Sequence, residues 1–204
     1  MISKEAPLIL ASRSPRRRAL LEQIRIPVEV RATDAEEIAR ADERAHDYLE
    51  RVVSAKIGEA LARVESGRAV LAADTEVVLD DRVLGKPRDD AHAKELLRSL
   101  AGRSHDVMTR FAIGSRERNV IAARTVVTRV VFRALSEAEI AGYVASGEGS
   151  DKAGAYAIQG LGAFAVERIE GSYSNVVGLP LAEVVVELVG AGLVRSFPLD
   201  AGAA

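Results

Sequence analysis

Apolar and polar residues follow two different periods along this chain, and their order predicts an α/β protein. Continuous or alternating apolar stretches predict strands at residues 8–11, 28–31, 68–73, 105–114 and 125–135. Helical spacing between start and stop signals predicts helices at residues 15–25, 90–100 and 137–146, and a longer helix that ends near residue 65. Because short turns join several strands, we expect a mixed twisted sheet flanked by helices.

Local signals define where several of these elements begin or turn. Asp42 is the expected cap of the longer helix, and Ser136 with Glu139 forms a capping box. Residues 75–87 predict a hairpin that turns at its two consecutive aspartates. These signals are local, so they predict elements but not how the elements pack.

The remaining sequence predicts one domain without repeats. Residues 151–171 are rich in glycine and end in a strand, and residues 172–189 form a loop that enters the last helix. We therefore expect a single domain over residues 1–204, with ends that fray at about 1–6 and 199–204.

Composition excludes several classes of protein. The chain of 204 residues is 48% hydrophobic and carries a formal net charge of −2, which argues against capture of nucleic acid or of an acidic membrane by bulk charge. It contains no cysteine, no apolar run of membrane-spanning length and no signal-peptide pattern at its beginning. We expect a cytoplasmic protein whose positive charge is used only locally.

The stretch "SRSPRRR" at residues 12–18 places three arginines at the beginning of a predicted helix, where the peptide dipole disfavours cations. At 100° per residue, Arg17 falls within the apolar stripe of this helix and Arg16 at its edge. Arg18 points outward, four residues before Glu22. Because an unpaired inward charge is costly and a helix N-terminus binds anions, the stretch suits a polyphosphate site. Solvated arginines, or pairing with carboxylates in the core, explain the spacing equally well.

Other polar residues interrupt apolar stretches. Lys56 lies within the apolar face of the long helix, where a packed stem with its amine in water is the favoured interpretation. Asp74 directly follows a predicted buried strand, so a general base or magnesium ligand and a simple turn cap are equally supported. The acidic loop at residues 33–37 is a weak second source of carboxylates, and the three histidines, without metal-binding spacing, are expected at the surface.

Six segments in order resemble the Maf family of nucleoside triphosphate pyrophosphatases, over roughly residues 8–188. They are "LASRSPRR", "RVVSAKIGEAL", "AADTEVVLDDRVLGKP", "LAGRSHDVMT", "TVVTRVVFRALSEAEIAGYVASGE" and "DKAGAYAIQGLGAFAVERIEGSYSNVVGLPL". The resemblance implies hydrolysis between the α and β phosphates, which gives a nucleoside monophosphate and pyrophosphate. It also implies two lobes around a central nucleotide-binding cleft, a Mg²⁺ or Mn²⁺ ion, and a homodimer.

The resemblance further implies roles for individual residues. It makes Asp74 the general base, with Asp74 and Glu37 as metal ligands, although Glu36 remains an alternative to Glu37. Phosphate binding is implied for Ser12, Arg16, Arg17, Lys56 and Lys86. The subgroup that acts on dTTP and UTP is similar to this chain at Arg16, Thr75 and Gln159. Nucleotide-pool cleansing is the implied role, and the alternative is a nucleotide-binding regulator of septum formation.

Overall fold

A mixed seven-stranded sheet forms the centre of the protein in the computed structural model, which describes residues 1–40 and 43–199. Its order is β2-β1-β3-β5-β6-β7, with β4 paired to β3; β1 is parallel to β2 and β3, and the other pairs are antiparallel. The strands are β1 (Leu8–Leu10), β2 (Val28–Val30), β3 (Ala69–Leu79), β4 (Arg82–Val83), β5 (Ser104–Ser115), β6 (Asn119–Phe132) and β7 (Val166–Glu170). The expected mixed sheet is confirmed.

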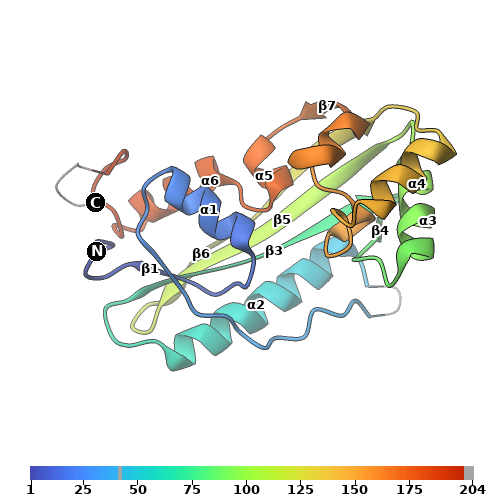
Figure 1. The fold of residues 1–204 in the computed structure, drawn as a ribbon. Helices are drawn as coiled ribbons and strands as arrows, with labels where there is room; N and C mark the ends of the chain where they lie inside the picture. The colour runs from blue at the N-terminus through green and yellow to red at the C-terminus, as the bar shows by residue number, and fades with distance from the viewer. Residues whose placement is uncertain (41–42, 200–204) are drawn as a thin grey trace.

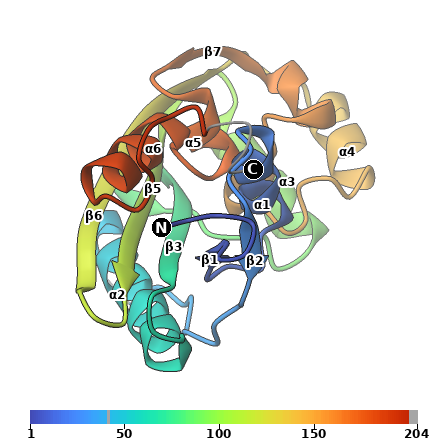
Figure 2. The same ribbon diagram turned by 90° about the vertical axis from the view of Figure 1, so that its left-hand side faces the viewer.

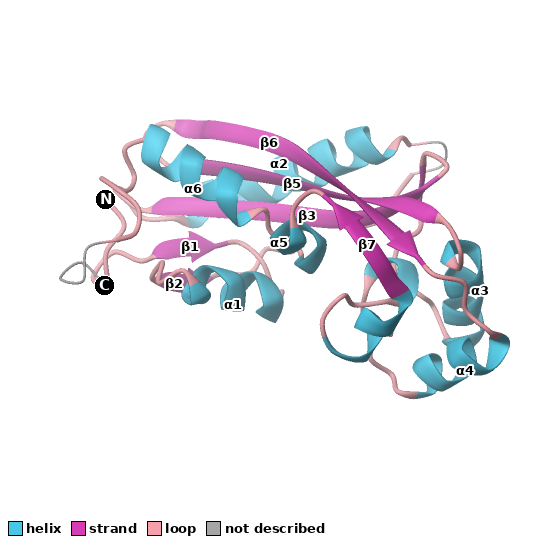
Figure 3. Cartoon of the chain, turned by 90° about the horizontal axis from the view of Figure 1, so that it is seen from above, coloured by secondary structure: helices cyan, strands magenta, loops and turns pink. Residues whose placement is uncertain are grey.

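Helices cover both faces of the sheet and gather at its two ends (Figure 1). They are α1 (Pro15–Gln23), α2 (Ala45–Arg63), α3 (Asp90–Leu100), α4 (Glu137–Ala145), α5 (Tyr173–Val177) and α6 (Leu181–Gly190), with 3-10 turns at Ala153–Ala155 and Gly160–Ala165. Seen from above, α1 and α6 lie at one end of the long strands, and α3 and α4 lie at the other (Figure 3). Seen from the end, α2 and α6 lie on opposite sides of the sheet (Figure 2).

The alternation of side chains along β3 divides the core. Val70 and Ala72 pack against Val53 and Ile57 of α2, whereas Leu71 on the other face joins the cluster under α1 and α6. Further along that second face, β3 enters a separate cluster with α3, α4 and the glycine-rich segment. The middle of β3 therefore lies between two hydrophobic clusters.

The length of β3 corrects one expectation that matters for the site. Asp74 does not end a strand: it lies inside the eleven residues of β3, paired with Arg110 of β5. The strand continues because β5 pairs with it from Ala69 to Val78, a tertiary contact that a local pattern does not reveal. The hairpin beyond it is confirmed, with positive φ at Asp80 and Asp81 in the turn.

The ends of several other elements are also settled. The capping box of Ser136 and Glu139 is present, but the expected loop before the last helix contains α5. The expected cap Asp42 lies outside the described residues, and α2 begins after Arg44. Ile2, within the segment expected to fray, is buried and its N–H donates to the Leu193 carbonyl at 2.9 Å. Residues 200–204 are likewise outside the described part of the chain.

Among residues 1–40 and 43–199, no helix has both the length and the apolar character needed to cross a membrane.

Candidate active site

A cavity of about 510 Å³ opens beside the middle of β3. Its walls come from segments far apart in the sequence: the loop before α1 with the first turn of that helix, the segment after β2, the middle of β3, and the glycine-rich segment. Single residues of α2, of the loop after β4 and of β5, together with the end of α5, complete the lining. Its volume lies in the range of small-molecule sites. The predicted site residues Ser12, Arg16, Arg17, Glu37, Lys56, Asp74, Thr75, Lys86 and Gln159 all line it.

The cavity occupies a gap along one edge of β3. On this edge β1 pairs with β3 at Val70 and Leu71, and β4 pairs at Val78 and Leu79. Between them, residues 72–77 have no strand partner on that side within the described chain, although the Leu84 N–H donates to the Val77 carbonyl at 2.9 Å. Because the strand alternates, side chains from both faces of β3 reach the gap. The sheet thus supplies a rigid, partly unpaired edge on which polar groups can be held.

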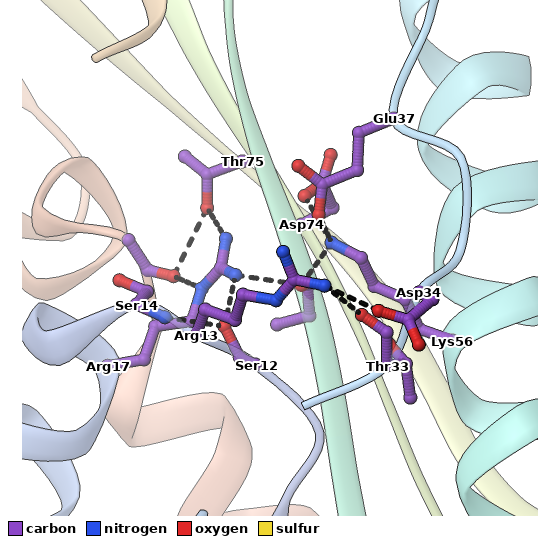
Figure 4. A network of polar contacts seen from close by, with 12 residues as sticks. Ser12, Arg13, Ser14, Arg17, Thr33, Asp34, Glu37, Lys56, Asp74 and Thr75 are labelled. Atoms are coloured by element: carbon purple, nitrogen blue, oxygen red, sulfur yellow. Dashed lines mark hydrogen bonds and ion pairs between the residues drawn. The ribbon is translucent and has the colours of Figure 1, made fainter. Parts of the chain in front are cut away.

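Arg17 is buried at 7% exposure, as its helical position predicts, but its partners belong to the protein. Its Nη1 donates to Ser12 Oγ at 3.0 Å and to the Ala73 carbonyl at 2.9 Å. Its Nε donates to the Gly178 carbonyl at 2.9 Å, and its Nη2 to Thr75 Oγ1 at 3.0 Å (Figure 4). Four of its five N–H groups are therefore occupied. Arg17 therefore links the loop before α1 to β3, and most of its donors are already used within the protein.

The other arginines of the same run have different surroundings. Arg18 Nε pairs with Glu22 at 2.7 Å, as the spacing predicted, and Arg13 pairs with Asp34 at 2.6 Å. Half-buried Arg16 donates only its Nε, to the Val177 carbonyl at 3.3 Å, and its Nη groups have no hydrogen-bond partner among the described residues. Burial lowers the pKa of Arg16, against the charge of Asp151. Arg16 is thus the arginine with donors left for a ligand.

Lys56 does not extend its amine to water, so the favoured interpretation from its spacing was wrong. The side chain crosses from α2 to the cavity at 3% exposure. Its Nζ lies 2.8 Å from Asp74 Oδ1 and 2.6 Å from Glu37 Oε1 (Figure 4). Exposed Lys86 lies 3.6 Å from the other oxygen of Glu37. Although burial raises the pKa of Glu37, its hydrogen bond to Lys56 and the charges of Lys56, Lys86 and Arg17 outweigh burial and lower it.

Glu76 is a cavity residue that the sequence pattern did not single out. It shares a face of β3 with Asp74 and is only 8% exposed, and its Oε2 has no hydrogen-bond partner among the described residues. Burial, then the charge of Asp74, raises its pKa to about 8. A glutamate within the apolar run "TEVVL" was the available signal, and it became meaningful only once β3 was known to continue.

The residues expected to select the base differ in how available they are. Thr75 Oγ1 accepts from Arg17 and lies 2.9 Å from Thr109 Oγ1 and 3.1 Å from the Gly178 carbonyl, so its hydroxyl is engaged within the protein. Gln159 lines the cavity and is exposed, with no hydrogen bond to its side chain among the described residues. Its amide therefore remains available to a ligand.

Two further features of the cavity wall were not anticipated. Asp151 and Lys152, paired with each other, line it from the glycine-rich segment. His105, expected at the surface, is buried behind the wall, with its Nε2 2.8 Å from the hydroxyl of Tyr156. Burial lowers the pKa of His105 to about 4, so the ring is neutral and packs as a core residue.

The donor set suits a hard divalent cation. Asp74 and Glu37 present carboxylate oxygens to the cavity, and Glu76 adds a buried oxygen without a partner among the described residues. In the described part of the chain, no group of three or more histidine, cysteine or acidic residues is placed to hold a metal ion, so this part offers at most two carboxylates to one ion. Mg²⁺ is commonly held by one or two carboxylates and completed by substrate phosphates and water, so these residues fit the expected ion.

The fold and the cavity together define an α/β protein with a cleft of small-molecule size, in which available basic donors lie beside carboxylates. The chain belongs to the Maf family: the family model described as "Maf-like protein" matches residues 7–191.

Relatives match nearly the whole chain. A dTTP/UTP pyrophosphatase of Desulfotalea psychrophila is 47% identical over 189 residues, which cover 93% of this chain and 96% of that protein. One of Methylococcus capsulatus is 47% identical over 206 residues, with all of both chains covered. Among solved structures, a nucleoside-triphosphatase (dITP/XTP pyrophosphatase) from Mycobacterium abscessus matches 62% of this chain and 74% of that chain, with 17% identity and a TM-score of 0.41.

Proposed function

We propose that this protein hydrolyses dTTP and UTP between the α and β phosphates, with a divalent metal ion, to give the nucleoside monophosphate and pyrophosphate. Membership of the Maf family and two near-full-length relatives named dTTP/UTP pyrophosphatase support this proposal. The observation that carries it is the contact of buried Lys56 with Asp74 and Glu37, next to the available donors of Arg16. This arrangement supplies both a base and positive charge at one cavity.

Phosphoanhydride cleavage depends mainly on positioning and on neutralising charge. Arg16 and Lys86 bind phosphate oxygens through their available N–H groups, and Arg17 keeps the loop that carries Ser12 in place. Asp74 orients the attacking water and accepts its proton, because its carboxylate reaches the cavity from a rigid strand. Asp74 and Glu37 would hold a Mg²⁺ or Mn²⁺ ion, which would supply positive charge near the phosphates and lower the pKa of a bound water.

Selection of the base is assigned to Gln159 and to the position of Arg16. An amide offers one donor and one acceptor side, which suits the neighbouring carbonyl and N–H of uracil or thymine. Thr75 acts indirectly, since its hydroxyl holds Arg17 and the Gly178 turn. We also propose nucleotide-pool cleansing in the cytoplasm as the physiological role, with a homodimer as the working assembly.

The test is pyrophosphate release from a panel of nucleoside triphosphates with Mg²⁺ or Mn²⁺. We expect dTTP and UTP to be preferred, and Asp74→Asn to lower kcat by about 100-fold or more because the base is lost. Asp90→Asn, at an exposed position of α3, is the matched control and should leave kcat unchanged. Nucleotide binding without pyrophosphate release would refute the proposal and support a nucleotide-binding regulator.

A further inference from the structure

The ammonium group of Lys56 lies between the two carboxylates that are assigned to the metal ion. It makes ion pairs of 2.6 Å with Glu37 and 2.8 Å with Asp74, and its one further acceptor among the described residues is the Ala73 carbonyl at 3.5 Å. Figure 4 shows Lys56 entering from α2, with Glu37 and Asp74 meeting at its Nζ. Any cation that binds both carboxylates must compete with this ammonium.

We propose that Lys56 competes with the divalent cation for Glu37 and Asp74, so that metal and polyphosphate bind this site together rather than separately. This inference rests on the proposed function, because it concerns the same cavity and the same ligand class. It assigns Lys56 a second role, as a positioning residue that sets the affinity of the site for metal.

The energetics follow from burial. Opposite charges at these distances attract each other strongly at the effective dielectric of a protein surface, and Lys56 is close to two carboxylates. Only 4% of the Lys56 side chain is exposed, so little water is in reach to replace the two carboxylates when a metal ion takes them from the ammonium. Phosphate oxygens in the cavity provide that replacement, so metal binding becomes favourable when a polyphosphate arrives.

Lys86 provides an internal comparison. It lies 3.6 Å from Glu37 but is 62% exposed, so it can return to water when a metal ion takes the carboxylate. Its competition with metal should be much weaker than that of Lys56, although both are lysines near the same carboxylate. The difference between the two variants therefore measures the combined effect of burial and of close contact with both carboxylates.

The experiment is a titration of the full chain with Mn²⁺ alone, without nucleotide, in which free Mn²⁺ is followed by electron paramagnetic resonance. Lys56→Met should bind Mn²⁺ at least about tenfold more tightly than the unmodified protein, since the competing charge is gone. Lys86→Met should change the affinity by about threefold or less. Lys94→Met on α3, outside the cavity lining, should match the unmodified protein.

Equal or weaker Mn²⁺ binding by Lys56→Met would overturn the inference. If Lys56→Met does not fold, Lys56→Gln is measured in its place, and Mn²⁺ should raise its melting temperature more than that of the unmodified protein. The two proposals fail separately. Pyrophosphate release by the unmodified enzyme with unchanged metal affinity in Lys56→Met refutes only the competition. Tighter Mn²⁺ binding without any pyrophosphate release refutes only the enzymatic function.

Discussion

Arg16 and Arg17 are neighbours in one helix, yet they differ in what they can offer a ligand. Arg17 donates hydrogen bonds to Ser12, Thr75 and two backbone carbonyls. Arg16, one helical position earlier, also lines the cavity, and its Nη groups have no hydrogen-bond partner in the described residues. Helical spacing correctly predicted that Arg17 points inward. It could not reveal that acceptors from β3 and from the Gly178 turn, 161 residues away in sequence from Arg17, meet it there.

The buried carboxyl group of Glu76 makes the free energy of unfolding depend on pH. Its folded pKa of about 8 lies above its ordinary value of 4.5, chiefly because of burial. Between these values the folded state holds a proton that the unfolded state has lost, so stability falls as pH rises. Glu76→Gln should remove this fall, and its free energy of unfolding relative to the unmodified protein should rise by a few kcal/mol, roughly, between pH 5 and pH 9.

Urea denaturation at a series of pH values measures this difference. Glu36→Gln, at an exposed position in the segment after β2, is the control and should follow the unmodified protein at every pH. A constant difference between Glu76→Gln and the unmodified protein across the range would show that Glu76 does not carry the proton.

The glycine-rich segment depends on one backbone conformation to reach β3. Gly154 has φ of 67°, and a Cβ there would lie 3.0 Å from Cγ1 of Val77. Its N–H also donates to the Gly85 carbonyl at 2.8 Å, which links the segment to the loop after β4. Gly154→Ala should lower the free energy of unfolding by about 1–2 kcal/mol, because an L-residue is strained in this region and meets Val77.

A second glycine offers the opposite expectation in the same assay. Gly58 lies in α2, and a Cβ added to it would meet no atom of the described residues within 4 Å apart from its chain neighbours and the backbone of its own helix. Gly58→Ala should therefore raise the free energy of unfolding by about 0.5–1 kcal/mol, because alanine favours the helix and has room there. Equal effects of the two substitutions in denaturation would contradict a special role for the conformation of Gly154.

Among the elements, the sequence correctly predicted those helices and turns that are determined by residues close together in the chain. The helix over residues 90–100, the capping box at Ser136 and the turn at Asp80 were correct because each signal lies within a few residues. The continuation of β3 through Asp74 was missed because pairing with β5 sustains it. The interpretation that the amine of Lys56 reaches water was also wrong, because its carboxylate partners Glu37 and Asp74 come from distant parts of the chain.

The whole molecule brings these elements to one cavity through a sheet whose order does not follow the sequence. β1 and β4 pair with the same edge of β3 and leave the gap between them. Lys56 reaches this gap from α2, where its Nζ pairs with Asp74. The family resemblance predicted which residues share the cavity, and all nine line it. Their division into engaged and available groups follows only from the assembled fold.

The segment at residues 31–40, which carries Glu37, is the part of the site that we expect to open most readily. These ten described residues form no helix or strand and are tied down mainly by side chains: Glu37 to Lys56, Asp34 to Arg13, and the Asp34 N–H to the carboxylate of Glu59. Such side-chain ties open more readily than the backbone ladder of a sheet. Because ligand phosphates and metal engage the same groups, binding should order this segment.

Hydrogen exchange tests this expectation with Mg²⁺ and a dTTP analogue whose α–β bridge is a non-hydrolysable methylene group. Amides at residues 33–38 should exchange at least about tenfold more slowly in the complex, because ligand binding stabilises the closed form over the locally open one. Amides of α6, which packs away from the cavity, should change little. Equal slowing in both regions would indicate general stabilisation of the protein, and no slowing at residues 33–38 would show that the segment takes no part in binding.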